Sequence, residues 1–231
     1  MSTAEPPVIV ALDACTEACS VALHVGELVF FRHAVIPRGH ARELLPMLDE
    51  LLAEAGVSRS AIGLVAYGRG PGAFTGVRIS VAVAQGLGRG LGCPLVGVSS
   101  LLAVAGVAAR EMSGSRIAVA MDARMGEVYW ALCERVHPER PIQIRGEESV
   151  LAPTEVALPA DWTDWHAAGT GWAAHGDAML AALGRAPTQL LDDALPDARC
   201  LLPHALEAWR NGALQGAASA RPVYLRDKVT G

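Results

Sequence analysis

The residues best suited to chemistry begin with a glycine-rich stretch, GRGPGAFTGVRIS, over residues 68–80. It leads from a predicted strand into a predicted helix over 75–91. Backbone N–H groups around Gly70 and Gly72, with Arg78 in the first helical turn, could bind a phosphate at the helix N-terminus. The alternative is that the glycines permit close packing of the helix on a strand. The spacing alone leaves both interpretations open.

Two aspartates form the second candidate for chemistry. The segments IVALDACTEACSVALHVG and IAVAMDARMGEVYWALC each contain an apolar strand, Asp-Ala, a short turn and a second strand. Asp13 and Asp122 hold equivalent places in this internal repeat. In a two-lobed nucleotide cleft, such carboxylates would hold Mg²⁺ or orient water. They would otherwise cap their own turns, which we favour for Asp122 and leave open for Asp13. A second glycine turn, at Gly169 and Gly171, follows another predicted strand.

Several classes of site are excluded by residue type. The chain has one lysine, Lys228, so it has no phosphate-loop lysine. His40 is followed four residues later by Leu44, so no helical histidine pair can hold a metal. The net charge of −5 disfavours a broad nucleic-acid surface. The five cysteines lie mostly in apolar runs, which indicates buried thiols in a reducing cytoplasm.

The elements that would position these residues form an α/β pattern. Strands are expected over 8–13, 19–25, 28–35 and 62–67, with helices over 41–55 and 75–91. The repeat predicts two lobes, over 1–112 and 113–231, with a last helix over 201–211 as a candidate to pack back on the first lobe. The N-terminus lacks a signal-peptide pattern. The uncharged span over 90–109 contains Gly, Pro and Ser-Ser, so it is interpreted as a strand and a capped helix rather than a membrane span.

The helices over 41–55 and 75–91 are apolar on more than one side. In the first, a stripe containing Leu44 and Leu48 is flanked by further apolar residues. The second has few charges and is expected to be capped by Thr75. Burial of both helices in the core would also account for this pattern, but we favour a protein interface built from two helices.

The segments ALDACTEACSVAL, AYGRGPGAFTGVRISVAVAQGL, AVAMDARMGEVYWALC, GTGW and PVYLR together resemble the TsaB (YeaZ) family over nearly the whole chain. The resemblance implies two duplicated lobes of the actin-like ATPase (ASKHA, RNase H-like) type, with mixed sheets flanked by helices. It also implies a role in making N6-threonylcarbamoyladenosine next to the anticodon of tRNAs that read ANN codons. The catalytic subunit there is a paralogue, TsaD, which uses an adenylate made by TsaC, and the ATPase TsaE completes the set.

The resemblance further implies that the two helices singled out above pair with those of TsaD. The paralogue carries a His-x3-His metal pair, whereas His40 stands alone here, so we expect no metal and no catalytic residue in this chain. The residues expected at the partner interface are His40, Leu45, Met47, Leu52, Thr75, Val77, Arg78, Val81 and Gln85. A vestigial nucleotide cleft would comprise Asp13, Gly70, Gly72, Asp122, Gly169 and Gly171.

The resulting hypothesis is a cytoplasmic, non-catalytic scaffold that binds and activates TsaD and contacts TsaE and tRNA only through the complex. The chain would bind no cofactor when it is alone, whereas ATP or ADP could bind at the complex with TsaD. Without TsaD, the chain would form a weak homodimer through the same two helices. The rival is an independent ATP-hydrolysing enzyme or kinase that uses Asp13 and Asp122. A direct tRNA-binding module is a weaker rival because the chain is acidic.

Overall fold

The computed structural model describes residues 5–36, 38–137 and 140–226, which form two units. The first comprises the described residues up to Ala103 together with Pro196–Val223. The second comprises Val104–Leu195 and the described residues from Tyr224. The observed division therefore falls within the third helix, before the predicted boundary at 112. The segment from Pro196 returns to the first unit, as proposed for the last helix.

The first unit contains a five-stranded mixed sheet in the order β3-β2-β1-β4-β5. β1 pairs antiparallel with β2 and parallel with β4, and it is buried along almost its whole length. The apolar, β-branched sequence VIVALD suits this central position. The strands are β1 (Val8–Asp13), β2 (Ala18–Val25), β3 (Leu28–Val35), β4 (Ile62–Gly68) and β5 (Leu95–Val98).

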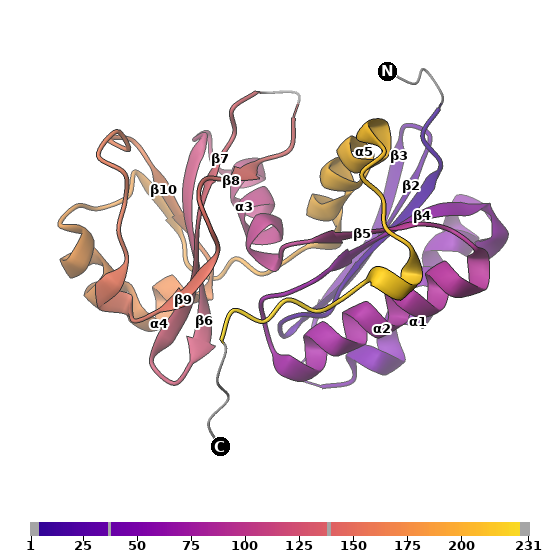
Figure 1. Ribbon diagram of the computed structural model, residues 1–231, viewed down its shortest axis with the longest axis horizontal. Coiled ribbons are helices and arrows are strands. Elements are labelled where there is room, and N and C mark those ends of the chain that lie inside the picture. Colours follow the sequence, from indigo (N-terminus) through magenta and orange to yellow (C-terminus); the bar gives the residue numbers. More distant parts are fainter. Residues whose placement is uncertain (1–4, 37, 138–139, 227–231) are drawn as a thin grey trace. The chain divides into compact units, whose positions relative to one another are not determined.

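Helices cover both faces of this sheet (Figure 1). α1 (His40–Ala55) and α2 (Phe74–Leu91) pack on one face, and α5 (Leu202–Asn211) packs on the other. α1 ends at Gly56, whose left-handed conformation and N–H bonds to the preceding carbonyls confirm it as the helix-ending residue. α2 begins one residue earlier than predicted, with Ala73 at the N-cap and no side-chain cap. The expectation that Thr75 caps α2 is therefore wrong.

The second unit repeats this topology. Its sheet has the order β11-β10-β6-β7-β8, in which β6 pairs antiparallel with β7 and parallel with β10. These pairings correspond to those of β1 with β2 and β4, so the predicted duplication is confirmed. The strands are β6 (Arg116–Arg124), β7 (Glu127–Glu134), β8 (Gln143–Ile144), β9 (Ser149–Leu151), β10 (His166–Ala168) and β11 (Gln189–Leu191). The helices are α3 (Ser100–Glu111), which the unit boundary divides, and α4 (Thr170–Leu183).

Tryptophans fill much of the second unit's core. Trp172 lies 6.0 Å from Trp130 and 5.8 Å from Trp165 between ring centroids, and its indole N–H donates to the carbonyl of Ala118. Buried aromatic rings supply large apolar contacts when their polar atom finds a partner. The packing of Trp172 therefore fixes α4 against β6.

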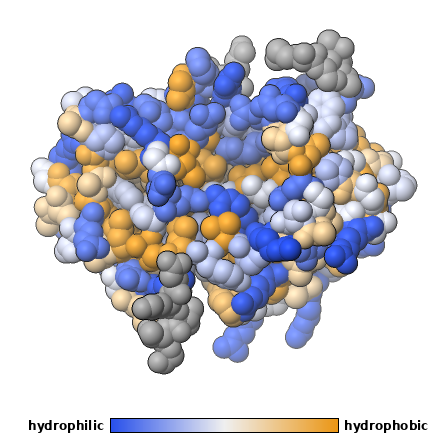
Figure 2. Space-filling view, viewed as in Figure 1, coloured by the Kyte–Doolittle hydropathy of each residue, from blue (hydrophilic) through white to orange (hydrophobic). Residues whose placement is uncertain are grey.

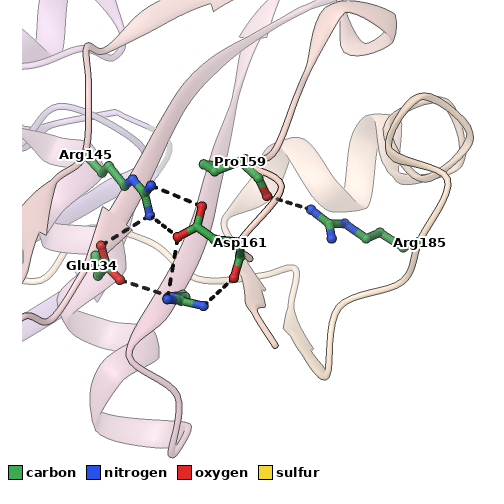
Figure 3. A network of polar contacts seen from close by, with 6 residues as sticks. Glu134, Arg145, Pro159, Asp161 and Arg185 are labelled. Atoms are coloured by element: carbon green, nitrogen blue, oxygen red, sulfur yellow. Dashed lines mark hydrogen bonds and ion pairs between the residues drawn. The ribbon is translucent and has the colours of Figure 1, made fainter. Parts of the chain in front are cut away.

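A partly exposed ionic network ties an irregular loop to this sheet (Figure 3). Both oxygens of Asp161 accept hydrogen bonds from Arg145, which also pairs with Glu134. Arg116 joins Glu134 to the main-chain carbonyl of Asp161, and Arg185 donates to the carbonyl of Pro159. These charges are paired with one another and orient the loop, so we assign them no role in a binding site.

Two further sequence interpretations are confirmed. All five cysteines are buried and free of disulfides. The apolar span over 90–109 forms the end of α2, β5 and most of α3. Over residues 5–36, 38–137 and 140–226, no helix has the length and apolar character needed to cross a membrane.

Candidate functional site

The glycine loop after β4 packs directly on the turn between β1 and β2. The N–H of Ala73 donates to the carbonyl of Cys15 at 2.7 Å. A β-carbon at Gly72 would lie less than 3.0 Å from that same carbonyl oxygen. One at Gly76 would overlap the carbonyl oxygen of Ala14. The loop's glycines therefore serve close backbone packing, which supports the structural interpretation over a phosphate cradle.

Asp13, at the end of β1, is fully buried beside this loop. Its carboxylate accepts hydrogen bonds from the Cys15 N–H at 2.8 Å and from the Ser100 hydroxyl at 3.4 Å. A β-carbon at Gly68 would overlap the second carboxylate oxygen. Desolvation by burial raises the pKa of Asp13 to about 6, although the hydrogen bonds from Cys15 and Ser100 oppose that shift. Asp13 thus acts within the turn and presents no accessible carboxylate.

Asp122 occupies the equivalent turn of the second unit. Its Oδ1 accepts the N–H of Arg124 at 2.8 Å, the same two-residue spacing that joins Asp13 to Cys15. The carboxylate also pairs with the Arg124 guanidinium at 2.9 Å. The backbone N–H of Asp122 donates to the hydroxyl of Thr170 at the start of α4. The favoured interpretation of Asp122 as a cap of its own turn is therefore confirmed.

The second glycine turn repeats the arrangement of the first. Gly169 has a φ of 105°, and a β-carbon there would overlap the carbonyl oxygen of Ala120 on β6. A β-carbon at Gly171 would lie less than 3.0 Å from the carbonyl carbon of Ala120. Each unit thus brings one aspartate and one glycine turn to the end of its own first strand. Asp13, Gly70 and Gly72 gather in one unit, and Asp122, Gly169 and Gly171 gather in the other.

The C-terminal PVYLR motif contacts a different turn in each unit. Val223 donates its N–H to the carbonyl of Arg69, beside Gly70 in the first unit. Arg226 forms an ion pair with Glu127 and donates to the carbonyl of Ala123 in the second unit. The motif thus adds contacts to the glycine loop of the first unit and to the β6–β7 turn of the second.

The outer surface of α1 and α2 is the candidate partner interface. Leu45 is 38% exposed, and Thr75 and Arg78 are also exposed. The guanidinium of Arg78 lies over the ring of Phe74, 3.3 Å from its centroid. Phe74 is 52% exposed. Figure 2 shows hydrophobic and hydrophilic residues mixed over the region of α2.

Four residues expected at this interface lie in the unit's own interior. His40, Leu52, Val77 and Val81 are each at most 8% exposed. Met47 and Gln85 are half-buried, and Gln85 donates to the carbonyl of Ala220 at 3.0 Å. The wide apolar surface of the helices covers the sheet more fully than the sequence interpretation assumed. The expectation that those four side chains face a partner is therefore corrected, because they have almost no accessible surface.

Phe74 was missed in the sequence. The helix was expected to begin at Thr75, so Phe74 was assigned to the preceding glycine loop, whereas α2 begins at Phe74. The signal that could have revealed it is the pairing with Arg78, four residues later on the same helical face.

No group of three or more histidine, cysteine, aspartate or glutamate side chains that could hold a metal occurs in the described part of the chain. The lone histidine of α1, His40, begins that helix and is buried, with its Nε2 lacking a hydrogen-bond partner. It therefore serves as a packed side chain in the structure as described.

The duplicated mixed sheets, each with a helix-covered face and an aspartate turn, define a two-lobed α/β protein of the actin-like type. A family model described as "TsaD: tRNA N6-adenosine threonylcarbamoyltransferase" matches residues 34–228. The chain is 42% identical to the tRNA threonylcarbamoyladenosine biosynthesis protein TsaB of Escherichia coli (strain K12), over 96% of this chain and 95% of that protein.

The TsaB of Haemophilus influenzae is 34% identical, over 96% of this chain and 94% of its own length. A solved structure described as YeaZ from Pseudomonas aeruginosa is 45% identical, with a TM-score of 0.88, over 95% of this chain and 100% of that one. The chain therefore belongs to the TsaB (YeaZ) family.

Proposed function

We propose that this chain takes part in tRNA threonylcarbamoyladenosine biosynthesis as a non-catalytic subunit that binds and activates TsaD. The modified nucleoside would be the adenosine next to the anticodon of tRNAs that read ANN codons. The observation that carries the proposal is the 42% identity to a TsaB over almost the full length of both chains. Binding would favour one conformation of TsaD, with an effect limited by the difference in affinity between its conformations.

The exposed part of α1 and α2 supports a helical interface for this partner. Leu45 and Phe74 offer apolar area, while Thr75 and Arg78 supply polar groups at its edge. A central apolar contact with a polar rim is the usual composition of such interfaces. The geometry of Asp13 and Asp122 supports the non-catalytic part of the proposal, because each carboxylate is engaged within its own turn.

The proposal extends to cofactors and location. We expect no cofactor to bind this chain alone and ATP or ADP to bind at the complex with TsaD. TsaE and tRNA would be contacted through the complex, in the cytoplasm. In the absence of TsaD, the same helical surface would self-associate weakly because exposed apolar area favours association.

The interface is tested by placing a charge at its exposed apolar positions. We expect Leu45→Glu and Phe74→Glu each to weaken binding of TsaD from the same organism at least about tenfold, because a buried carboxylate would replace apolar contact. Calorimetric titration measures the affinity. The matched control is Val136→Glu, since Val136 is 63% exposed in the second unit.

Unchanged TsaD affinity in both helix variants, with normal circular dichroism, would contradict the interface. An ATP titration of the isolated chain addresses the rival function. Tight ATP binding with turnover, and no complex with TsaD, would replace the scaffold proposal with an independent ATPase.

A further inference from the structure

The chain that follows α5 passes β5 and then α2 (Figure 1). This segment, residues 213–223, is called the clasp below. Leu95 on β5 exchanges two backbone hydrogen bonds with Gln215, at 2.8 and 3.0 Å. At the other end of the clasp, the N–H of Val223 donates to the carbonyl of Arg69 at 2.8 Å. The clasp therefore covers the β5 edge of the sheet and is held near both of its ends.

The clasp contacts the second half of α2. The side-chain amide of Gln85 donates to the carbonyl of Ala220 at 3.0 Å. A β-carbon at Gly88 would lie 3.3 Å from the β-carbon of Ala217, in the short helix η4 (Ala217–Ser219). Ala220 is fully buried and joins the apolar core of the first unit. The position of α2 therefore depends on the clasp as well as on the sheet.

The clasp also borders the loop from which α2 begins. A β-carbon at Gly70 would lie 2.9 Å from the carbonyl oxygen of Val223 and 3.2 Å from the methyl groups of Val77. This loop leads directly into Phe74, the first residue of α2. The clasp therefore constrains α2 at its start and in its second half.

Few apolar side chains hold the clasp in place. Every residue of the clasp is described, and Ala220 is the one that is fully buried. Its single methyl group contributes little apolar area. The side chain of Gln215 adds a hydrogen bond to the hydroxyl of Tyr67 at 2.9 Å. A segment with so few buried apolar contacts opens at a lower free-energy cost than a core strand does.

We infer that the clasp is a positioning element for α2: it opens without unfolding of the sheet, and TsaD binds the chain with the clasp closed. The inference rests on the proposed function, because Phe74, Thr75 and Arg78 of α2 belong to the proposed interface. A surface that is already ordered loses less entropy on binding. Opening removes contacts that order α2, so the open form has the lower affinity. Gln85 acts through Ala220 and is a positioning residue.

Closure of the clasp and binding of TsaD must then affect each other equally. If TsaD binds the closed form more tightly, it lowers the population of the open form by the same factor, because a coupling free energy is reciprocal. A direct contact between Gln85 and TsaD has no such consequence at the β5 edge. Hydrogen exchange at this edge therefore separates a positioning role from a contact.

Hydrogen exchange at single amides of the isolated chain tests the opening. The amide of Leu95 donates to Gln215 in the clasp, whereas the amide of its neighbour on β4, Val65, donates to Pro94. Both Leu95 and Val65 are 0% exposed, so Val65 is the matched control. We expect Leu95 to exchange at least about tenfold faster than Val65 after correction for intrinsic rates. Equal protection of the two amides would overturn the inference.

Substitutions at Gln85 test its hold on the clasp. Gln85→Glu keeps the shape of the side chain but removes the N–H donor. We expect exchange at Leu95 to become about three- to tenfold faster, which corresponds to the loss of one hydrogen bond. Gln85→Lys retains a donor and should keep the rate within about twofold of the native value. Gln189→Glu, at an exposed position of the second unit, is the control for added charge.

A charge at Ala220 tests the coupling to TsaD. We expect Ala220→Asp to hold the clasp open, because a buried carboxylate is strongly unfavourable, and to weaken TsaD binding at least about tenfold. Continued protection of Val65 would show that the sheet remains folded. Ala218→Asp is the matched control, since Ala218 is an exposed residue of the same segment. In the native chain, saturating TsaD should slow exchange at Leu95 about fivefold or more.

The outcomes separate this inference from the proposed function. Rapid exchange at Leu95 in Ala220→Asp, with unchanged TsaD affinity, would overturn the inference and leave the proposed function in place. TsaD binding that leaves exchange at Leu95 unchanged would also overturn it. A native chain that does not bind TsaD would overturn the proposed function and, with it, the role of the clasp in binding.

Discussion

Replacing Gly76 by alanine is expected to destabilise the protein by about 3 kcal/mol, even though alanine is the better helix former. The new β-carbon would overlap the carbonyl oxygen of Ala14, and its neighbour in space is backbone rather than a flexible side chain. Relief would require α2 to move away from the β1–β2 turn. That movement would strain the hydrogen bond from Ala73 to Cys15. Urea unfolding followed by circular dichroism measures the loss.

Gly86 provides the matched control on the same helix. A β-carbon there would meet no atom within 4 Å. Gly86→Ala should therefore stabilise the protein by about 0.5–1 kcal/mol through reduced backbone freedom in the unfolded chain. Opposite signs for the two substitutions would show that contact with the turn, and not helix propensity, determines the need for glycine. Equal stability of the two variants would contradict the close packing described here.

Replacing Asp13 by asparagine is expected to stabilise the protein by about 3 kcal/mol at pH 8. Burial raises the pKa of Asp13 from 3.8 to about 6. The folded state therefore holds the proton more tightly than the unfolded state, and native stability falls as pH rises from about 4 to 6. Asparagine keeps an acceptor for the Cys15 N–H but carries no charge, so it removes this loss.

The gain should shrink as pH falls through this window, because Asp13 is then protonated in both states. Free energies of unfolding at pH 4, 6 and 8 measure the trend. Asp193→Asn is the control, since Asp193 is exposed. A variant less stable than the native protein at pH 8 would mean that the charge of Asp13 is used in the fold, and would renew the case for a ligand at that turn.

The sequence by itself determined the local elements and the repeat. The apolar β-branched run of β1 and the paired strand–turn–strand segments predicted two lobes, and the two sheets have matching topology. The placement of Gly56 at the end of α1 was also predictable, because helix termination depends on the local backbone conformation. The same holds for Asp122, whose partner lies two residues away.

Tertiary structure alone decided which apolar residues face outward. The stripes on α1 and α2 were too wide to identify a single buried face, so buried Val77 and exposed Leu45 were placed in the same predicted interface. Helical spacing gives the angle between side chains but not the elements that meet them. Phe74 became visible only when the helix start was located.

The glycine loop shows the same limit most clearly. Its spacing suited either an anion or a neighbouring backbone, because both require a chain without side chains. The choice between them depended on the β1–β2 turn, more than fifty residues earlier in the chain, whose carbonyls meet Gly72 and Gly76. A contact between residues so distant in sequence leaves no local pattern, and only the folded chain reveals it.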